Sequence, residues 1–377
     1  MISLTFPRLA SLRLPRHHPA PIHLFAGVTL VPIPLLLAAG FWGGGFALAA
    51  LLYIAVFLAL FDHLAGAALP DAPEGAEFPA ADRLSVTLAL VHFPLLALGV
   101  AALSGATDLG WGSRVLIFLS YGLFFGQVSN SNAHELIHRS SRGLQTLGAA
   151  VYTSLLFGHH SSAHRLVHHR FVATDDDPNS AALGESFYDF APRAWRGSFV
   201  AGYEMEAALR RRITPREGGP ARRLRAQLRR INPYVFYISG AVAAMGAATL
   251  VFGPGGLVAL IALAGYAQIQ LLLSDYVQHY GLRRRDLGMG QHEPIGPAHS
   301  WDAPHPASSL WMLNAPRHGD HHAHPNRPYP ALRLTAAGAA APTLPHALPV
   351  MATLALFPPL FRRAMAPRLA ALRPPVR

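Results

Sequence analysis

Long apolar stretches dominate the hydrophobic pattern of this chain of 377 residues. Six of them are long enough, or nearly so, to cross the roughly 30 Å hydrocarbon layer of a bilayer as helices. They cover residues 22–40, 44–61, 84–103, 114–132, 233–252 and 256–277. The pattern therefore predicts one integral-membrane domain over residues 1–377, an all-α polytopic protein with six transmembrane helices.

Polar residues gather after the fourth and the sixth stretch, in segments 133–232 and 278–377. An even number of spans returns the chain to its starting side, so both segments and both termini are expected on one side, which we assign to the cytosol. Residues 1–21 are expected to form a cytosolic tail, because no convincing signal-peptide cleavage site precedes the first span. The two polar segments would form a cytosolic cap on the helices.

Three segments of this cap have weaker patterns. Residues 145–158 are apolar but short, and they suit a re-entrant or interfacial helix better than a span. Residues 209–230 hold nine arginines, which fit a solvated helix face and a docking surface equally well. Residues 347–360 contain three prolines, and we expect them to lie on the surface or to pack against the bundle.

Composition supports a membrane protein and narrows its partners. Charged residues make up 14% of the chain, whereas soluble domains carry about 25%. The net charge is +11, and every basic residue apart from histidine is arginine. Given the apolar stretches, an anionic membrane leaflet or an acidic protein partner explains this charge better than nucleic acid. The absence of cysteine excludes disulfides, thiolate zinc sites and iron–sulfur clusters.

Nine histidines recur at short spacings beside the apolar stretches. Residues four apart lie on one face of a helix, as His134 and His138 do, and as His164 and His168 do. Four to six ligands fill the coordination sphere of one metal ion, so nine imidazoles suit two ions. Unpaired imidazoles beside a membrane are costly to bury, which disfavours a purely structural role. The candidate ligands are His134, His138, His164, His168, His169, His279, His318, His321 and His322.

Five carboxylates stand beside these histidines in the sequence. A ligating imidazole usually donates its second N–H group to a carboxylate or a carbonyl group. Each of the five is explained equally well as a solvated acid or as a helix cap. They are Glu135, Asp176, Asp177, Asp275 and Asp320.

An all-nitrogen ligand set suits iron, zinc or copper. Zinc has no redox chemistry, and hydrolytic zinc sites typically use three protein ligands and one open position. Two irons at the end of an apolar bundle instead suggest dioxygen chemistry on an apolar substrate, with electrons from a separate protein. A histidine-rich metal transporter is the alternative from another class. The ligands of a transporter should lie near the membrane midplane. The spans have few ionisable residues, of which His92 is the main one, and the nine histidines gather at one face, which argues against transport.

Four motifs resemble those of the membrane di-iron alkane 1-monooxygenase family. They are HELIHR at 134–139, HRLVHHRFVATDDDP at 164–178, QHYG at 278–281 and RHGDHHAHPNRPY at 317–329. That family is grouped with membrane fatty-acid desaturases and with the side-chain hydroxylases of xylene and cymene. The QHYG motif is the specific one, because desaturases have histidine boxes but not this element. The similarity runs from about residue 60 to residue 365.

The resemblance implies six membrane helices in a bacterial inner membrane and two irons held by the nine histidines named above. It implies insertion of one oxygen atom from O2 into a terminal C–H bond of an alkane or alkyl chain. Electrons would come from rubredoxin or a ferredoxin that is fed by an NADH-dependent reductase. Hydroxylation of a methyl group on an aromatic ring and desaturation of an acyl lipid remain alternatives.

Two positions bear on the substrate and on the site. In alkane hydroxylases a bulky residue on the second span is thought to limit chain length, and the matching position looks to be Ile54, next to Tyr53. An ordinary packing or lipid-facing residue explains that position equally well. The family typically has a glutamate before the first histidine of the second box, whereas this chain has Ala163. The surroundings of that box are therefore expected to differ.

Overall fold

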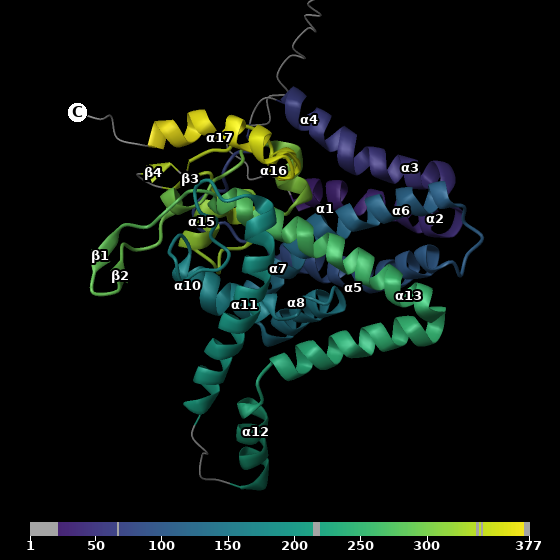
Figure 1. The fold of residues 1–377 in the computed structure, drawn as a ribbon, viewed down its shortest axis with the longest axis horizontal. Coiled ribbons are helices and arrows are strands. Elements are labelled where there is room, and N and C mark those ends of the chain that lie inside the picture. The colour runs from purple at the N-terminus through teal and green to yellow at the C-terminus, as the bar shows by residue number, and fades with distance from the viewer. Residues whose placement is uncertain (1–21, 66–67, 214–218, 337–338, 341, 373–377) are drawn as a thin grey trace, which may run out of the picture.

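The computed structural model describes residues 22–65, 68–213, 219–336, 339–340 and 342–372 (Figure 1). The expected cytosolic tail, residues 1–21, lies outside the described residues. Helices provide nearly all of the regular structure, so the prediction of a mostly helical protein is confirmed. Long helices run side by side, and shorter elements gather at one end of them (Figure 1).

The first two apolar stretches form two helical runs joined by a tight turn. Gly43 makes this turn with a φ of 61°, which glycine adopts without the steric cost of a side chain. A π-helical turn at Tyr53–Phe57 interrupts the second run. Helices α1 (Ile22–Leu30) and α2 (Pro32–Trp42) form the candidate span Ile22–Trp42, and α3 (Gly44–Leu52) and α4 (Leu58–Ala65) form the candidate span Gly44–Ala65.

The third apolar stretch is α5 (Pro79–Ser104), which is also a candidate span. The fourth forms α6 (Trp111–Phe124), a π-helical turn at Phe125–Ser129 and α7 (Asn130–His138) without a break. This run is not among the candidate spans, because it ends in polar residues such as Asn130 and Asn132. Both are buried inside the protein, and the Asn130 side chain donates to the Ala267 carbonyl oxygen at 2.8 Å.

The fifth and sixth stretches form one helical element, α13 (Tyr234–His279), the fourth candidate span. Gly253 leaves the helical conformation with φ 67° and ψ −166°, and Pro254 follows it. The chain reverses direction there, so α13 has two arms (Figure 1). The described residues thus contain four helices that are long and apolar enough to cross a membrane. Six separate crossings stay a prediction.

The cap consists of shorter helices and two small antiparallel hairpins. Thr335 pairs with Ala340 in one hairpin, and Asp286 pairs with His292 in the other. These elements are α8 (Arg142–Ser154), α9 (His160–Ala163), α10 (His169–Phe171), α11 (Phe187–Arg211), α12 (Pro220–Arg230), β1 (Asp286–Gly288), β2 (Gln291–His292), α14 (Pro306–Trp311), α15 (His318–Ala323), β3 (Thr335–Ala336), β4 (Ala339–Ala340), α16 (Leu348–Ala355) and α17 (Pro358–Leu372).

Two of the weakly patterned segments fit their expectations in part. The segment 145–158 lies largely in α8, which packs against α7 at Gly148. A Cβ atom at Gly148 would lie 2.8 Å from the Ala133 carbonyl oxygen, so only glycine permits this approach. The segment 347–360 forms α16 and the start of α17, and α16 packs against α13. The arginine-rich segment covers the end of α11 and all of α12, with residues 214–218 outside the described part.

Buried polar contacts join the apolar helices to the cap. The Asp62 carboxylate, at the end of α4, accepts hydrogen bonds from the Ala307 and Ser308 backbone N–H groups at 2.6 and 3.1 Å. It therefore satisfies the first free amides of α14. The buried Arg317 guanidinium pairs with Asp71 at 2.5 Å and donates to the Leu69 carbonyl oxygen at 2.6 Å. These contacts fix α14 and the start of α15 over the bundle.

Candidate metal centre

Four segments deliver the nine predicted histidines to one region. His134 and His138 lie one turn apart at the end of α7, beyond its buried polar residues. His279 is the last residue of α13, and α15 carries three histidines within one turn and a half. The second histidine box, residues 164–169, follows α9 and forms a π-helical turn at His164–His168 and the start of α10.

The π-helical turn decides how the histidines of the second box divide between two groups of histidines. Helical spacing placed His164 and His168 on one face of a helix. In the structure the wider turn brings His169, five residues on, to His164, with their Nε2 atoms 2.9 Å apart. His168 points to a different set of histidines, since its ring centroid lies 4.7 Å from that of His279. Such π-helical turns are frequent at functional sites.

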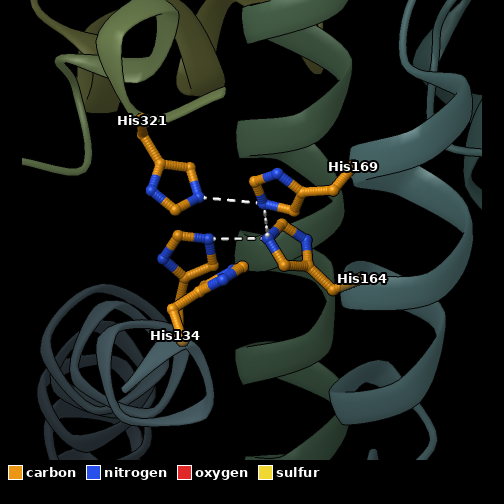
Figure 2. Close-up of side chains that lie close together, drawn as sticks. His134, His164, His169 and His321 are labelled. Carbon is orange, nitrogen blue, oxygen red and sulfur yellow. Dashed lines mark hydrogen bonds between the residues drawn. The ribbon is translucent and has the colours of Figure 1, made fainter. Parts of the chain in front are cut away.

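The nine histidines form two groups, whose potential ligand atoms lie within 4.8 Å of one another in each group. Figure 2 shows four members of the larger group, with ring nitrogens of His134, His164, His169 and His321 turned toward one another. The larger group contains His134, His138, His164, His169 and His321, and the smaller contains His168, His279, His318 and His322.

Several ring nitrogens within each group lie close enough together to bind one metal ion. The Nε2 atoms of His134 and His164 are 2.8 Å apart, and those of His169 and His321 are 3.0 Å apart. In the smaller group, His318 Nε2 lies 3.1 Å from His322 Nε2.

The electrostatic surroundings keep most of these imidazoles neutral. Burial, followed by the neighbouring imidazoles, lowers the pKa of His138, His164 and His169 well below the ordinary value. The neutral ring is the form that binds a metal. The Nε2 atoms of His138 and His168 are buried and have no hydrogen-bond partner in the described structure. A bound metal would satisfy such nitrogens, so the residues present fit a di-metal site.

Of the five predicted carboxylates, Asp177 reaches a candidate ligand directly. His168 Nδ1 donates to its Oδ2 atom at 2.8 Å, and both side chains are buried. Burial lowers the pKa of His168, but Asp177 more than compensates and the pKa of His168 ends above its ordinary value. Asp275 is linked to this contact through Asn179, whose side chain donates to Asp275 Oδ2 at 2.6 Å. Asn179 is also the residue whose backbone N–H group donates to Asp177 Oδ1.

The other three carboxylates have different neighbours from those expected. Glu135 accepts the Tyr329 backbone N–H group at 3.3 Å and lies 3.4 Å from the Arg139 guanidinium. Asp320 accepts from Arg327 at 2.6 Å and pairs with His324 at 3.0 Å. Asp176 is exposed. Among the described contacts, none joins these three side chains to a candidate ligand.

Sequence reasoning missed three residues near the centre. The ring centroid of His160 lies 5.1 Å from that of His164, four residues on, so the same helical spacing could have included it. His279 Nδ1 lies 3.3 Å from the His299 carbonyl oxygen. Asp302 accepts the Gly319 backbone N–H group at 2.7 Å, at the start of the helix that carries His318. No local pattern in the sequence joined Asp302 to α15.

A match to a family model decides the family. The model described as fatty acid desaturase matches residues 109–355, which include all nine histidines. The chain belongs to the fatty acid desaturase family. With four candidate membrane spans, this family member is an integral membrane protein.

The most informative relatives are alkane 1-monooxygenases. Alkane 1-monooxygenase 2 of Pseudomonas aeruginosa is 31% identical over 319 residues, which are 83% of this chain and 81% of the relative. Alkane 1-monooxygenase 1 of the same organism is 32% identical over 263 residues, 70% of this chain and 65% of the relative. Alkane 1-monooxygenase 2 of Alcanivorax borkumensis is 31% identical over 265 residues, 70% of this chain and 64% of the relative.

These relatives confirm the predicted resemblance. The chain is an alkane 1-monooxygenase-like oxidoreductase of the desaturase family, and its two histidine groups are consistent with a di-metal site.

Two cavities lie beside the centre. A small one of about 50 Å³ touches both groups, since His134, His164 and His318 line it together with His160. A larger one of about 340 Å³ lies between α4, α13 and α16, and Ile54 lines it. Tyr53 does not line either cavity, and its hydroxyl group donates to the Val28 carbonyl oxygen at 3.0 Å.

A hydrogen-bonded partition separates the two cavities. Gly126, Leu271 and Met312 line the small cavity, and the residues next to them in sequence, Gln127, Gln270 and Trp311, line the larger one. Trp311 Nε1 donates to Gln127 Oε1 at 2.7 Å, and Gln127 Nε2 donates to Gln270 Oε1 at 3.2 Å. The chain at residues 126–127, 270–271 and 311–312 therefore lies between the two cavities.

Proposed function

We propose that this enzyme hydroxylates a terminal carbon of alkanes or alkyl chains with O2, at two irons held by its nine histidines. The observation that carries the proposal is the pair of adjoining all-histidine groups, with five and four members, beside a cavity. The names of the relatives support the reaction type. When bound, the two irons supply redox chemistry with O2 that acid–base side chains cannot provide.

The donor set favours iron over zinc. Structural zinc sites almost always have four protein ligands and hydrolytic ones typically three, whereas the larger group offers five imidazoles. The five histidines of the larger group would hold one iron and the four of the smaller group would hold the other. His168 is held by the buried Asp177 carboxylate, which fixes its ring orientation and raises the basicity of its Nε2 atom.

Apolar substrate would arrive from the membrane side. The cavity at Ile54 is lined mostly by apolar residues of α4, α13 and α16, and a hydrocarbon dissolved in the bilayer could enter it without passing through water. The partition of Trp311, Gln127 and Gln270 would then separate it from the histidines. Apolar walls discriminate weakly, since each methylene group is worth about 1 kcal/mol. The length of the alkane that fits would therefore be limited by a side chain that blocks the cavity, either Ile54 or a residue of the partition.

The proposal includes six membrane crossings in a bacterial inner membrane. The two arms of α13 would make two of them, and the run from α6 to α7 would make another, with its polar residues turned inward. The histidines and both termini would then face the cytosol. Because the chain has no cysteine, electrons would come from rubredoxin or a ferredoxin with its NADH-dependent reductase. Exposed arginines of α12, including Arg222 and Arg229, suit an acidic donor of this kind.

Metal analysis and product analysis on one preparation test the proposal. The purified protein in detergent is given rubredoxin, its reductase, NADH and a mixture of octane, hexadecane and p-xylene. About two irons per chain and an O2-dependent primary alcohol from an alkane are expected. Benzylic alcohol alone would move the enzyme to methyl groups on aromatic rings, and an alkene would indicate desaturation. Bound zinc without oxygen uptake would refute the monooxygenase and favour a metal transporter.

A further inference from the structure

A third cavity, of about 730 Å³, is lined by none of the nine histidines. It shares no lining residue with the two cavities described above. Residues of α8, the π-helical turn of the second box, α11 and the first arm of α13 line it, and we refer to it as the α8–α13 groove. Its volume lies within the range of about 300–1,000 Å³ that small-molecule sites occupy.

The apolar part of the α8–α13 groove follows two helices. Ala149 and Ala150 of α8 face Phe236 and Ala244 of α13 across it. The groove continues along the first arm of α13, which belongs to a candidate membrane span. The small side chains leave a slot in a part of the protein where lipid acyl chains would be the surrounding solvent.

Three arginines line the same cavity. Arg165 donates to the Ser161 and Ile137 carbonyl oxygens at 3.2 and 3.4 Å, and no carboxylate among the described residues pairs with it. Arg142 is exposed at the start of α8 and has no described ion pair either. Arg210 is the exception, because Glu206 pairs with it at 2.7 Å. Two guanidinium groups thus face the groove with their positive charge uncompensated.

We propose that the α8–α13 groove binds an anionic phospholipid, with the phosphate at Arg142 and Arg165 and an acyl chain between α8 and α13. Guanidinium groups bind phosphate oxygens through paired N–H donors. Basic pockets between membrane helices on the cytosolic side recognise anionic headgroups in this way. A zwitterionic headgroup would place its own ammonium group among the arginines and bind less well. None of the nine histidines lines the groove, although Arg165 directly follows His164, and lipid binding there does not depend on the proposed hydroxylation.

Native mass spectrometry of the full-length protein in detergent tests the site. The protein is incubated with equimolar dioleoyl-phosphatidylglycerol and dioleoyl-phosphatidylcholine, and the retained lipids are counted. The wild type is expected to retain phosphatidylglycerol preferentially. Arg142→Gln should lower that preference about fivefold, since one arginine near an anionic headgroup contributes about 1 kcal/mol. Ala149→Phe should fill the slot and lower retention of both lipids.

Arg196→Gln is the matched control, because Arg196 is an exposed arginine of α11 that does not line the groove. It should retain phosphatidylglycerol as the wild type does. Equal retention of the two lipids by the wild type would overturn the proposal. So would an unchanged preference in Arg142→Gln. Added oleate that displaces phosphatidylglycerol completely would assign the groove to a free fatty acid and overturn the phospholipid.

Discussion

The contact between His168 and Asp177 gives the sharpest test of the metal centre. Three donors converge on the buried Asp177 carboxylate. His168 Nδ1 and Ser180 Oγ donate to its Oδ2 atom at 2.8 and 2.7 Å, and the Asn179 backbone N–H group donates to Oδ1 at 3.1 Å. Asp177→Asn keeps the shape but replaces one oxygen by an NH2 group, which is a donor. In one orientation the NH2 group of the asparagine faces the donors of His168 and Ser180, and in the other it faces the Asn179 N–H group.

The substitution should weaken metal binding at the smaller histidine group. Loss of such a supporting contact typically costs 10–100-fold in metal affinity, which is about 1.4–2.7 kcal/mol. Fe(II) affinity of the purified protein can be measured by competition with a chelator of known strength. Ser180→Ala, which removes one donor and leaves the carboxylate, should have a smaller effect.

The same aspartate run provides the control. Asp176 is adjacent in sequence but exposed, so Asp176→Asn should leave Fe(II) affinity within about twofold of the wild type, as surface substitutions usually have small effects. Circular dichroism of each variant checks that the helices are retained. If Asp177→Asn and Asp176→Asn bind Fe(II) equally well, the reasoning about His168 is refuted.

Three further predictions concern the α13 turn, the cavity partition and the metal. Gly253→Ala should lower the free energy of unfolding by about 1–3 kcal/mol, because its φ and ψ are accessible essentially to glycine alone, whereas Gly246→Ala within the helix should not. Thermal melts in detergent distinguish the two, and equal melting points would contradict the argument. Trp311→Phe leaves the buried Gln127 Oε1 atom without its indole donor, so stability should fall by about 1–3 kcal/mol. Longer alkanes should also become better substrates in product assays, and an unchanged chain-length profile would remove the partition from the substrate path. Chelation of the metal should lower the melting temperature reversibly, because an ion that binds only the folded state stabilises that state. A melting temperature that changes neither with chelator nor with added Fe(II) would contradict a structural contribution of the metal.

Local patterns in the sequence predicted much of the candidate site. Helical spacing placed His134 and His138 on one face of α7, as the structure shows. At the second box, spacing did not show that a π-helical turn places His164 and His168 in different groups. Spacing cannot reveal such a turn, because one extra residue per turn depends on how the segment packs. Sequence proximity likewise could not distinguish the buried Asp177 from the exposed Asp176.

The sequence by itself determined which segments are apolar and which residues are candidate metal ligands. Those properties belong to single residues and to their periodicity, so they can be read without knowing any long-range contact. Only the tertiary structure decided which histidines share a group, because His169 and His321 meet although 152 residues separate them. It also decided that the partition of Trp311 and Gln127 lies between two cavities. Such contacts arise from the packing of distant helices, and no local pattern encodes them.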